Sequence, residues 1–160
     1  MQYLQTLFAN LNIEVMAYQH QAVFTCEQAN DLLLTIPGAK TKNLFLKDKK
    51  GKRHFLFIVK DNLEVNLKVL AERLKVNSLS FASEQRLANF LDSEGGRVSL
   101  LDIFKDKQNL VELVIDHGIF EMESIQCHPY SNEATWVIDT QDIKRLLSHH
   151  RREYQLINVQ

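Results

Sequence analysis

The sequence predicts an α+β fold, in which helices surround a sheet that is mixed or largely antiparallel. Three observations lead to this prediction. Segments with helical apolar spacing alternate with short strand-like segments, two strand-like segments flank a clear hairpin turn, and neither repeats nor low-complexity stretches interrupt the chain. Because hairpins join antiparallel neighbours, a doubly wound parallel sheet is not expected.

Length and composition suit one compact domain over residues 1–160. Of the 160 residues 45% are hydrophobic and 24% are charged, which is enough to bury a sizeable core. The start of the chain shows no basic leader before a long apolar block, and no run of about 18 uncharged apolar residues occurs. We therefore expect a cytoplasmic protein that does not associate with a membrane.

Helices are predicted where apolar residues recur at helical spacing: residues 2–11, 26–34, 66–74, 84–91 and 141–150. Three hydroxyl residues precede such segments, namely Thr25, Ser83 and Thr140. A hydroxyl oxygen at this position can accept a hydrogen bond from a free backbone N–H of the first turn. We therefore expect these residues to cap their helices.

Strands are predicted over residues 13–18, 41–48, 54–60, 110–116, 123–128 and 134–139. The pairing of 41–48 with 54–60 is the clearest, because residues 49–53 between them contain Gly51 and form a hairpin turn.

The strand over 41–48 begins with two polar residues, Lys42 and Asn43. Side chains alternate along a strand, so Lys42 shares a face with Leu44 and Leu46, while Asn43 shares one with Phe45. If the leucine face is buried, Lys42 points inward, where an ammonium is costly without a partner. Spacing alone favours a lysine that snorkels to water over a functional lysine.

Charge is concentrated in one place. The net charge of −1 argues against an indiscriminate nucleic-acid binder. Yet seven basic residues stand against the single acid Asp48 between positions 40 and 53: Lys40, Lys42, Lys47, Lys49, Lys50, Lys52 and Arg53. A smaller cluster, "SHHRR", occupies residues 148–152. Such a cluster is either a solvated turn or a local contact for phosphate on an otherwise acidic protein.

Standard catalytic and cofactor motifs are absent from the sequence. It contains no G-x-S-x-G, P-loop, G-x-G-x-x-G or H-E-x-x-H pattern. Its six histidines lack the spacing of metal ligands, and Cys26 and Cys127 are most simply reduced, partly buried thiols. We expect neither a metal nor a cofactor.

Two further segments could carry chemistry. In "EGGRVSLL", Gly95 and Gly96 can present consecutive N–H groups to an anion or oxyanion, although a plain turn is the commoner meaning of a glycine pair. In "CHPYSNEATWVI", residues 128–132 form a polar turn between two strands, which alone indicates only a loop with a satisfied histidine.

Taken together, "TKNLFLKDKKG", "GRVS" and "CHPYSNEATWVI" resemble the editing-domain superfamily of YbaK and the prolyl-tRNA synthetase insertion domain, and most closely its free-standing ProX branch (PrdX, ProXp-ala). "HQAVFTCEQA" and "LSFASEQRLANFL" fit the same order, so the resemblance covers nearly the whole chain. It implies a curved mixed sheet surrounded by helices. It also implies hydrolysis of mischarged aminoacyl-tRNA, with Ala-tRNA(Pro) as the expected substrate and prolyl-tRNA synthetase as a possible recruiting partner.

The resemblance also assigns residue roles. Lys42 would position the ester end or a neighbouring phosphate, Asn43 would hydrogen-bond the substrate, and the loop at Gly96 would stabilise the acyl carbonyl as charge develops. Because the 2′-OH of the terminal adenosine assists, no protein nucleophile or metal is implied. The implied acyl-pocket residues are Val98, Ser99, Leu100, His128, Asn132 and Thr135. The expected tRNA contacts are Lys47, Lys49, Lys50, Lys52 and Arg53.

One departure from the family pattern concerns the acyl pocket. The family's glycine-x-x-x-proline loop here runs from Gly96 to Leu100, with leucine in place of proline. Proline fixes φ, so its absence is expected to loosen the pocket or change its size. A rival hypothesis is therefore a non-catalytic module that binds tRNA ends or free amino acids in the same pocket.

Overall fold

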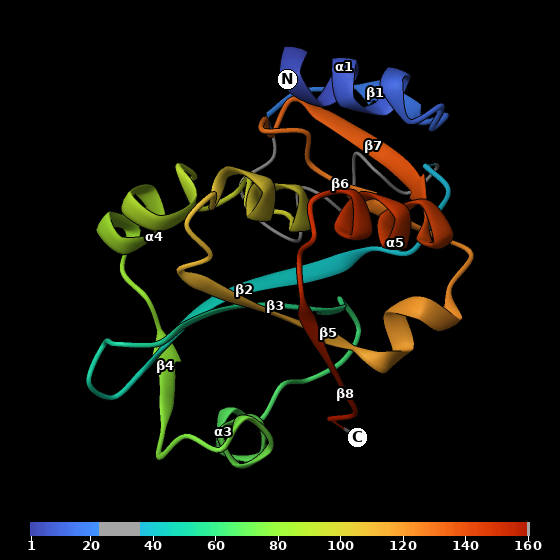
Figure 1. Cartoon of the computed structure of the whole chain (residues 1–160). Coiled ribbons are helices and arrows are strands. Elements are labelled where there is room, and N and C mark those ends of the chain that lie inside the picture. The colour runs from blue at the N-terminus through green and yellow to red at the C-terminus, as the bar shows by residue number, and fades with distance from the viewer. Residues whose placement is uncertain (23–35, 160) are drawn as a thin grey trace.

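The structure is a computed structural model that describes residues 1–22 and 36–159 (Figure 1). Its larger sheet has five strands in the order β4–β2–β3–β5–β8. Their bounds are β2 Thr41–Asp48, β3 His54–Lys60, β4 Leu79–Phe81, β5 Val111–Asp116 and β8 Tyr154–Ile157. β2 is antiparallel to β3 and β4, whereas β5 is parallel to β3 and β8. The sheet is therefore mixed, as predicted.

A second sheet has three antiparallel strands in the order β1–β7–β6. They are β1 Met16–Gln19, β6 Ser124–Cys127 and β7 Ala134–Asp139. An isolated parallel bridge between Ala39 and Ile125 ties this sheet to the segment that leads into β2. The predicted strands thus divide between two linked sheets, because β6 and β7 pair with β1.

The helices are α1 Gln2–Asn10, α3 Leu67–Leu74, α4 Glu84–Leu91 and α5 Thr140–His149, with 3₁₀ helices η1 Leu100–Lys105 and η2 His117–Glu121. Ser83 caps α4 as predicted, since its hydroxyl accepts from the N–H of Arg86 at 3.2 Å. The expected Thr140 cap is wrong. Asp139 caps α5, while the Thr140 hydroxyl donates to the Met122 carbonyl at 2.7 Å.

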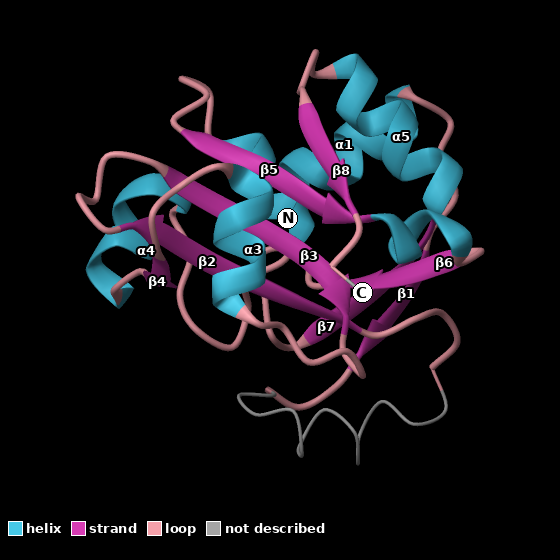
Figure 2. Ribbon diagram, turned by 90° about the horizontal axis from the view of Figure 1, so that it is seen from below, coloured by secondary structure: helices cyan, strands magenta, loops and turns pink. Residues whose placement is uncertain are grey.

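The two faces of the larger sheet bury different cores. Phe45, Leu56 and Ile58 face a core shared with α1, α5 and the smaller sheet, whereas Leu46 and Phe57 face a core shared with α3. Figure 2 shows α3 crossing in front of β3, with α1 behind the strands. Alternation along β2 therefore decides which side of the molecule each of its side chains reaches.

Three predicted strands, over 41–48, 54–60 and 134–139, have the predicted bounds. The strand expected from residue 13 begins only at Met16, and the short strands β4 and β8 were not predicted. The helix expected over 26–34 and its cap Thr25 lie outside the described residues. Within the described residues, no helix is both long enough and apolar enough to span a membrane.

Candidate active site

The glycine loop, residues 93–99, connects α4 to η1. Gly96 has a φ of +92°, which L side chains rarely adopt. A Cβ at Gly95 would lie 2.7 Å from the Glu84 carboxylate. The N–H of Gly95 donates to that carboxylate at 3.1 Å. Among the described residues, no acceptor pairs with the N–H of Gly96. Only the second of the two predicted N–H groups is therefore available to a developing oxyanion.

The glycine loop docks on the His128 turn, residues 128–133, which joins β6 to β7. The buried Ser99 hydroxyl donates to the His128 carbonyl at 2.8 Å, and the Arg97 guanidinium donates to the Tyr130 carbonyl at 3.0 Å. Val98 packs against the core beneath. Two segments about 30 residues apart, each singled out by the sequence, are thus adjacent in the fold.

Leu100 is the first residue of η1 and is buried. Ser99 caps this helix by accepting from the N–H of Leu101 at 3.2 Å, and the Asp102 carboxylate accepts from the N–H of Ser99 at 3.0 Å. The first helical position is one that proline favours. A capping box therefore restrains the backbone at the place where the family carries proline.

His128 is held as a neutral ring. Burial lowers the pKa of His128, and nearby His20 lowers this pKa further. The hydrogen bond to the Ala134 carbonyl raises the pKa but does not reverse the shift. Since a carbonyl can only accept, Nδ1, 3.2 Å from the Ala134 oxygen, carries the proton. Nε2 then presents a lone pair, so the ring can accept a hydrogen bond from a ligand.

His20 also belongs to this cluster, although the sequence did not single it out. Its Nδ1 lies 2.7 Å from the Gln21 carbonyl and its Nε2 lies 2.8 Å from the hydroxyl of buried Thr135. In the neutral ring Nδ1 donates, so Nε2 accepts from Thr135. His20 could have been found from the sequence, because it is the first residue of "HQAVFTCEQA", one of the segments that carry the family resemblance. Asn132 lies half-buried in the adjacent turn.

Asn43 and Lys42 lie on opposite faces of β2. Asn43 pairs with Ile58 and faces the core beneath the glycine loop; its amide oxygen is buried and has no hydrogen-bond partner among the described residues. Lys42 pairs with Val59 on the α3 face, and its ammonium donates to the Leu63 carbonyl. The described contacts thus bring Asn43, but not Lys42, to the face that carries Gly96 and His128.

The basic hairpin, residues 47–53, has an exposed tip at Lys49, Lys50 and Lys52, while Lys47 is half-buried. Arg53 is already paired, because its guanidinium donates to the Glu112 carboxylate at 2.8 and 2.9 Å. A cavity of about 270 Å³ separates the hairpin from the residues that follow α3 and is lined in part by Lys75. Lys75 adds a basic residue that the sequence pattern did not indicate.

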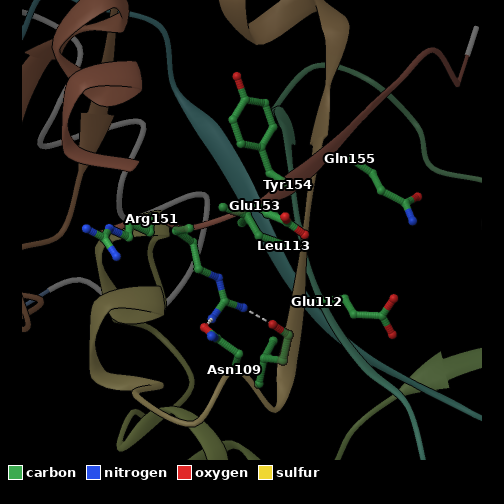
Figure 3. Close-up of a pocket in the computed structure, with 9 residues that line it drawn as sticks. Asn109, Glu112, Leu113, Arg151, Glu153, Tyr154 and Gln155 are labelled. Carbon is green, nitrogen blue, oxygen red and sulfur yellow. Dashed lines mark hydrogen bonds between the residues drawn. The ribbon is translucent and has the colours of Figure 1, made fainter. Parts of the chain in front are cut away.

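A second cavity, of about 500 Å³, lies at the start of β5 and β8 and contains none of the predicted site residues (Figure 3). Its Arg152 is almost fully buried, pairs with Asp106 at 3.3 Å and donates to Asn109 and the Val111 carbonyl. Figure 3 shows Arg151 and Glu112 on opposite sides of this cavity. Within the "SHHRR" cluster, Arg152 therefore fixes the fold.

Covalent and metal chemistry find little support among the described residues. Burial raises the pKa of the Cys127 thiol to about 12, so that thiol stays protonated and is a poor nucleophile. Over residues 1–22 and 36–159, no group of three or more His, Cys, Asp or Glu side chains is arranged to hold a metal ion.

The chain is similar in sequence to known proteins. The family described as "Aminoacyl-tRNA editing domain" matches residues 20–146. The chain is 30% identical to the prolyl-tRNA editing protein ProX of Acetoanaerobium sticklandii, covering 93% of this chain and 91% of ProX. It is 36% identical to prolyl-tRNA synthetase associated domain-containing protein 1 of Danio rerio, covering 90% of this chain and 79% of the relative.

Solved structures share the fold. A hypothetical protein superposes with a TM-score of 0.76 at 11% identity, covering 98% of this chain and 97% of the other. A protein described as a candidate trans-editing enzyme for prolyl-tRNA synthetase superposes with a TM-score of 0.69 at 14% identity, covering 99% and 95%. With the match over residues 20–146, these findings show that the chain belongs to the aminoacyl-tRNA editing domain family.

Proposed function

We propose that this chain acts in trans on mischarged tRNA(Pro), hydrolysing Ala-tRNA(Pro) to free alanine and tRNA. Its family makes it an aminoacyl-tRNA deacylase, that is, a hydrolase of the ester between amino acid and tRNA. The name of its relative, a prolyl-tRNA editing protein, supports tRNA(Pro) as the tRNA. Action as one domain over residues 1–160 and recruitment by prolyl-tRNA synthetase are parts of the same proposal.

One observation carries the proposal: the glycine loop and the His128 turn meet through the 2.8 Å bond from Ser99 to the His128 carbonyl. In this proposal the N–H of Gly96, which no described residue engages, lies on the same side of the sheet as Asn43, His128 and Thr135. A donor for a carbonyl oxygen and acceptors for the rest of an aminoacyl group then surround one site.

The protein needs to supply only positioning and electrostatic stabilisation, because an aminoacyl ester is already activated. Water adds to the acyl carbon, the carbon–oxygen bond to the terminal ribose breaks, and the leaving ribose oxygen takes up a proton. The vicinal 2′-OH assists this step, while Gly96 N–H stabilises the charge on the carbonyl oxygen. The unpaired Asn43 amide oxygen accepts from the substrate, which would satisfy a polar atom that is otherwise costly to bury.

Selection of alanine over proline is steric in this proposal. We place buried Thr135 and Leu100 and half-buried Val98 in the wall of the acyl pocket, where their packing leaves the wall little room to move. A pocket that fits a methyl group cannot admit the proline ring, and exclusion by size discriminates better than the loss of a small apolar contact.

The tRNA body is bound by the basic hairpin together with Lys75. Lys49, Lys50 and Lys75 line one cavity together with Arg53 and Asp48, and the excess of positive charge there suits a backbone phosphate. Lys42 would contribute its ammonium near the terminal nucleotide, since none of the ion pairs among the described residues engages it.

A deacylation panel tests the function. Alanyl-, cysteinyl-, seryl- and prolyl-tRNA(Pro) are each incubated with the protein, and the fraction still acylated is followed over time. We expect hydrolysis of the alanyl ester and sparing of the prolyl ester. Tight binding of every tRNA without turnover would favour the rival hypothesis of a non-catalytic binding module.

A further inference from the structure

Both ends of the glycine loop are anchored on one buried carboxylate. A single oxygen of Asp102 accepts from the Ser93 hydroxyl at 3.0 Å and from the N–H of Ser99 at 3.0 Å. Ser93 and Ser99 are the first and last residues of the loop, and both are buried with Asp102. The first and the last residue of the loop are therefore held by the same oxygen atom.

Lys105 completes this anchor from the far end of η1. Its ammonium lies 3.0 Å from the other oxygen of Asp102 and donates to the Asp92 carbonyl, just before the loop, at 2.8 Å. The same ammonium lies 4.2 Å from the ring centre of Tyr130 in the His128 turn. One ion pair, the Asp102–Lys105 clasp, thus contacts the start of the loop, its end and the surface on which it docks.

Burial makes this clasp sensitive to the loss of either partner. Asp102 is fully buried and Lys105 has a side chain only 17% exposed. Removing one member of a buried pair leaves an uncompensated charge, and the groups that it held then lose their anchor. Between its fixed ends, the described contacts that hold the loop are the bond from Gly95 to Glu84, the bond from the Arg97 N–H to the Glu94 carbonyl, the Arg97 guanidinium on Tyr130 and the packing of Val98.

We propose that the Asp102–Lys105 clasp positions the glycine loop and thereby sets how strictly the acyl pocket excludes large amino acids. The clasp supplies the rigidity that a proline at position 100 would otherwise give. Asp102 and Lys105 are positioning residues that act through Gly96 and Ser99. The inference rests on the proposed function for its effect on selectivity, but the anchoring itself can be measured without substrate.

The test compares Lys105→Met, which keeps the length of the side chain but removes its charge, with the matched control Lys107→Met at an exposed lysine two residues away. Hydrogen exchange of the peptide covering residues 93–99 is measured by mass spectrometry, with α3 as the internal reference. We expect Lys105→Met to accelerate exchange of the loop by at least about 10-fold and Lys107→Met to leave it unchanged.

The same variants are then compared in single-turnover deacylation. We expect Lys105→Met to lower the ratio of the alanyl to the prolyl rate at least about 10-fold, with tRNA affinity unchanged. Unchanged exchange of the loop, or faster exchange with an unchanged rate ratio, would overturn the proposal. If the wild-type protein hydrolyses neither ester, the proposed function fails, and the exchange measurement still decides the anchoring.

A milder variant provides the same test if Lys105→Met does not fold. Ser93→Ala removes one hydroxyl from the anchor and leaves the ion pair intact. If Lys105→Met does not fold, Ser93→Ala should still accelerate exchange of the loop by a smaller factor and shift the rate ratio in the same direction; no change in either would refute the clasp.

Discussion

Lys42 and Asn43 are neighbours in the sequence, but their side chains lie on different faces of β2. Asn43 lies on the face that packs beneath the glycine loop, where no described residue pairs with its buried amide oxygen, whereas Lys42 lies on the α3 face and donates to the Leu63 carbonyl. A half-buried ammonium whose partner among the described residues is a carbonyl gains strongly from an added negative charge. We therefore assign Lys42 to the phosphate of the terminal nucleotide and Asn43 to the acyl end.

Lys42→Ala should leave the protein folded and lower the single-turnover rate of Ala-tRNA(Pro) deacylation by at least about 100-fold. In this assignment Lys42 acts by fixing the terminal phosphate from the α3 face of β2, and a misplacement of the ester by about 1 Å can cost about 100-fold in rate. Lys42→Arg should not restore the rate fully, because a planar guanidinium cannot replace a compact ammonium.

The control for this lysine is Lys49→Ala at the exposed hairpin tip. That variant should weaken tRNA binding while retaining the rate at saturating enzyme. A wild-type rate in Lys42→Ala under the same conditions would show that Lys42 merely snorkels from the end of its strand.

Two histidines, buried His54 and half-buried His128, make stability depend on pH. Burial lowers the pKa of His128 and of His54, with Arg86 adding to the effect at His54. Their folded-state pKa values lie below the usual 6.5, so the unfolded chain binds protons more readily as the pH falls through that value. We therefore expect the free energy of unfolding to be constant between about pH 7 and pH 8 and to decrease below about pH 6.5.

Denaturant titrations at pH 5 and pH 7.5 measure this decrease. It should be smaller in His54→Phe, which keeps the stacking on Phe90 but cannot titrate. Asp102 acts in the opposite sense: burial raises the pKa of its carboxyl, so its contribution to stability falls as the pH rises above 3.8. An equal pH dependence in wild type and His54→Phe would refute the role of His54.

At the scale of elements, α4 connects the basic hairpin to the glycine loop. Arg86 donates to the Gly51 carbonyl of the hairpin at 3.2 Å and lies 2.9 Å from His54. Two residues earlier, Glu84 holds the N–H of Gly95. One two-turn helix thus fixes the hairpin and the glycine loop relative to each other, as a substrate that spans both requires.

The basic hairpin should govern the salt dependence of tRNA binding. Replacing Lys49, Lys50 or Lys75 by Gln should each lower the slope of log K against log salt by roughly 0.7 to 0.9 if that residue contacts a phosphate. Arg53→Gln should change the slope less and stability more, because its guanidinium is engaged by Glu112. Filter binding over a salt series gives these slopes.

Lys144→Gln provides the matched control. Lys144 lies on α5, which Figure 1 shows on the other side of the molecule from the β2–β3 hairpin. This variant should retain the wild-type slope. Slopes that are equal in all lysine variants would reduce the hairpin to a solvated turn.

At the scale of the whole molecule, local patterns predicted the elements better than their arrangement. The β2–β3 hairpin follows from alternation and a glycine turn, so its bounds matched. β4 and β8 have only 3 and 4 residues, and their pairing with β2 and β5 depends on distant partners that a short pattern cannot indicate.

The residues of the candidate site likewise fall into those that a local pattern indicated and those that only the fold revealed. Gly96, Ser99 and His128 stand in recognisable segments, and the fold joins them. Asp102, Lys105 and Lys75 carry no local pattern: their importance lies in which atoms they meet across a loop or a cavity. Nor could alternation alone show that the leucine face of β2, and Lys42 with it, turns toward α3.

The proposed editing of Ala-tRNA(Pro) is tested most directly by single-turnover deacylation of Ala-tRNA(Pro) and Pro-tRNA(Pro) at saturating enzyme. We expect the alanyl ester to be hydrolysed at least about 100-fold faster than the prolyl ester, because the pocket excludes the larger ring. Equal rates on the two esters, or no hydrolysis of either, would contradict it.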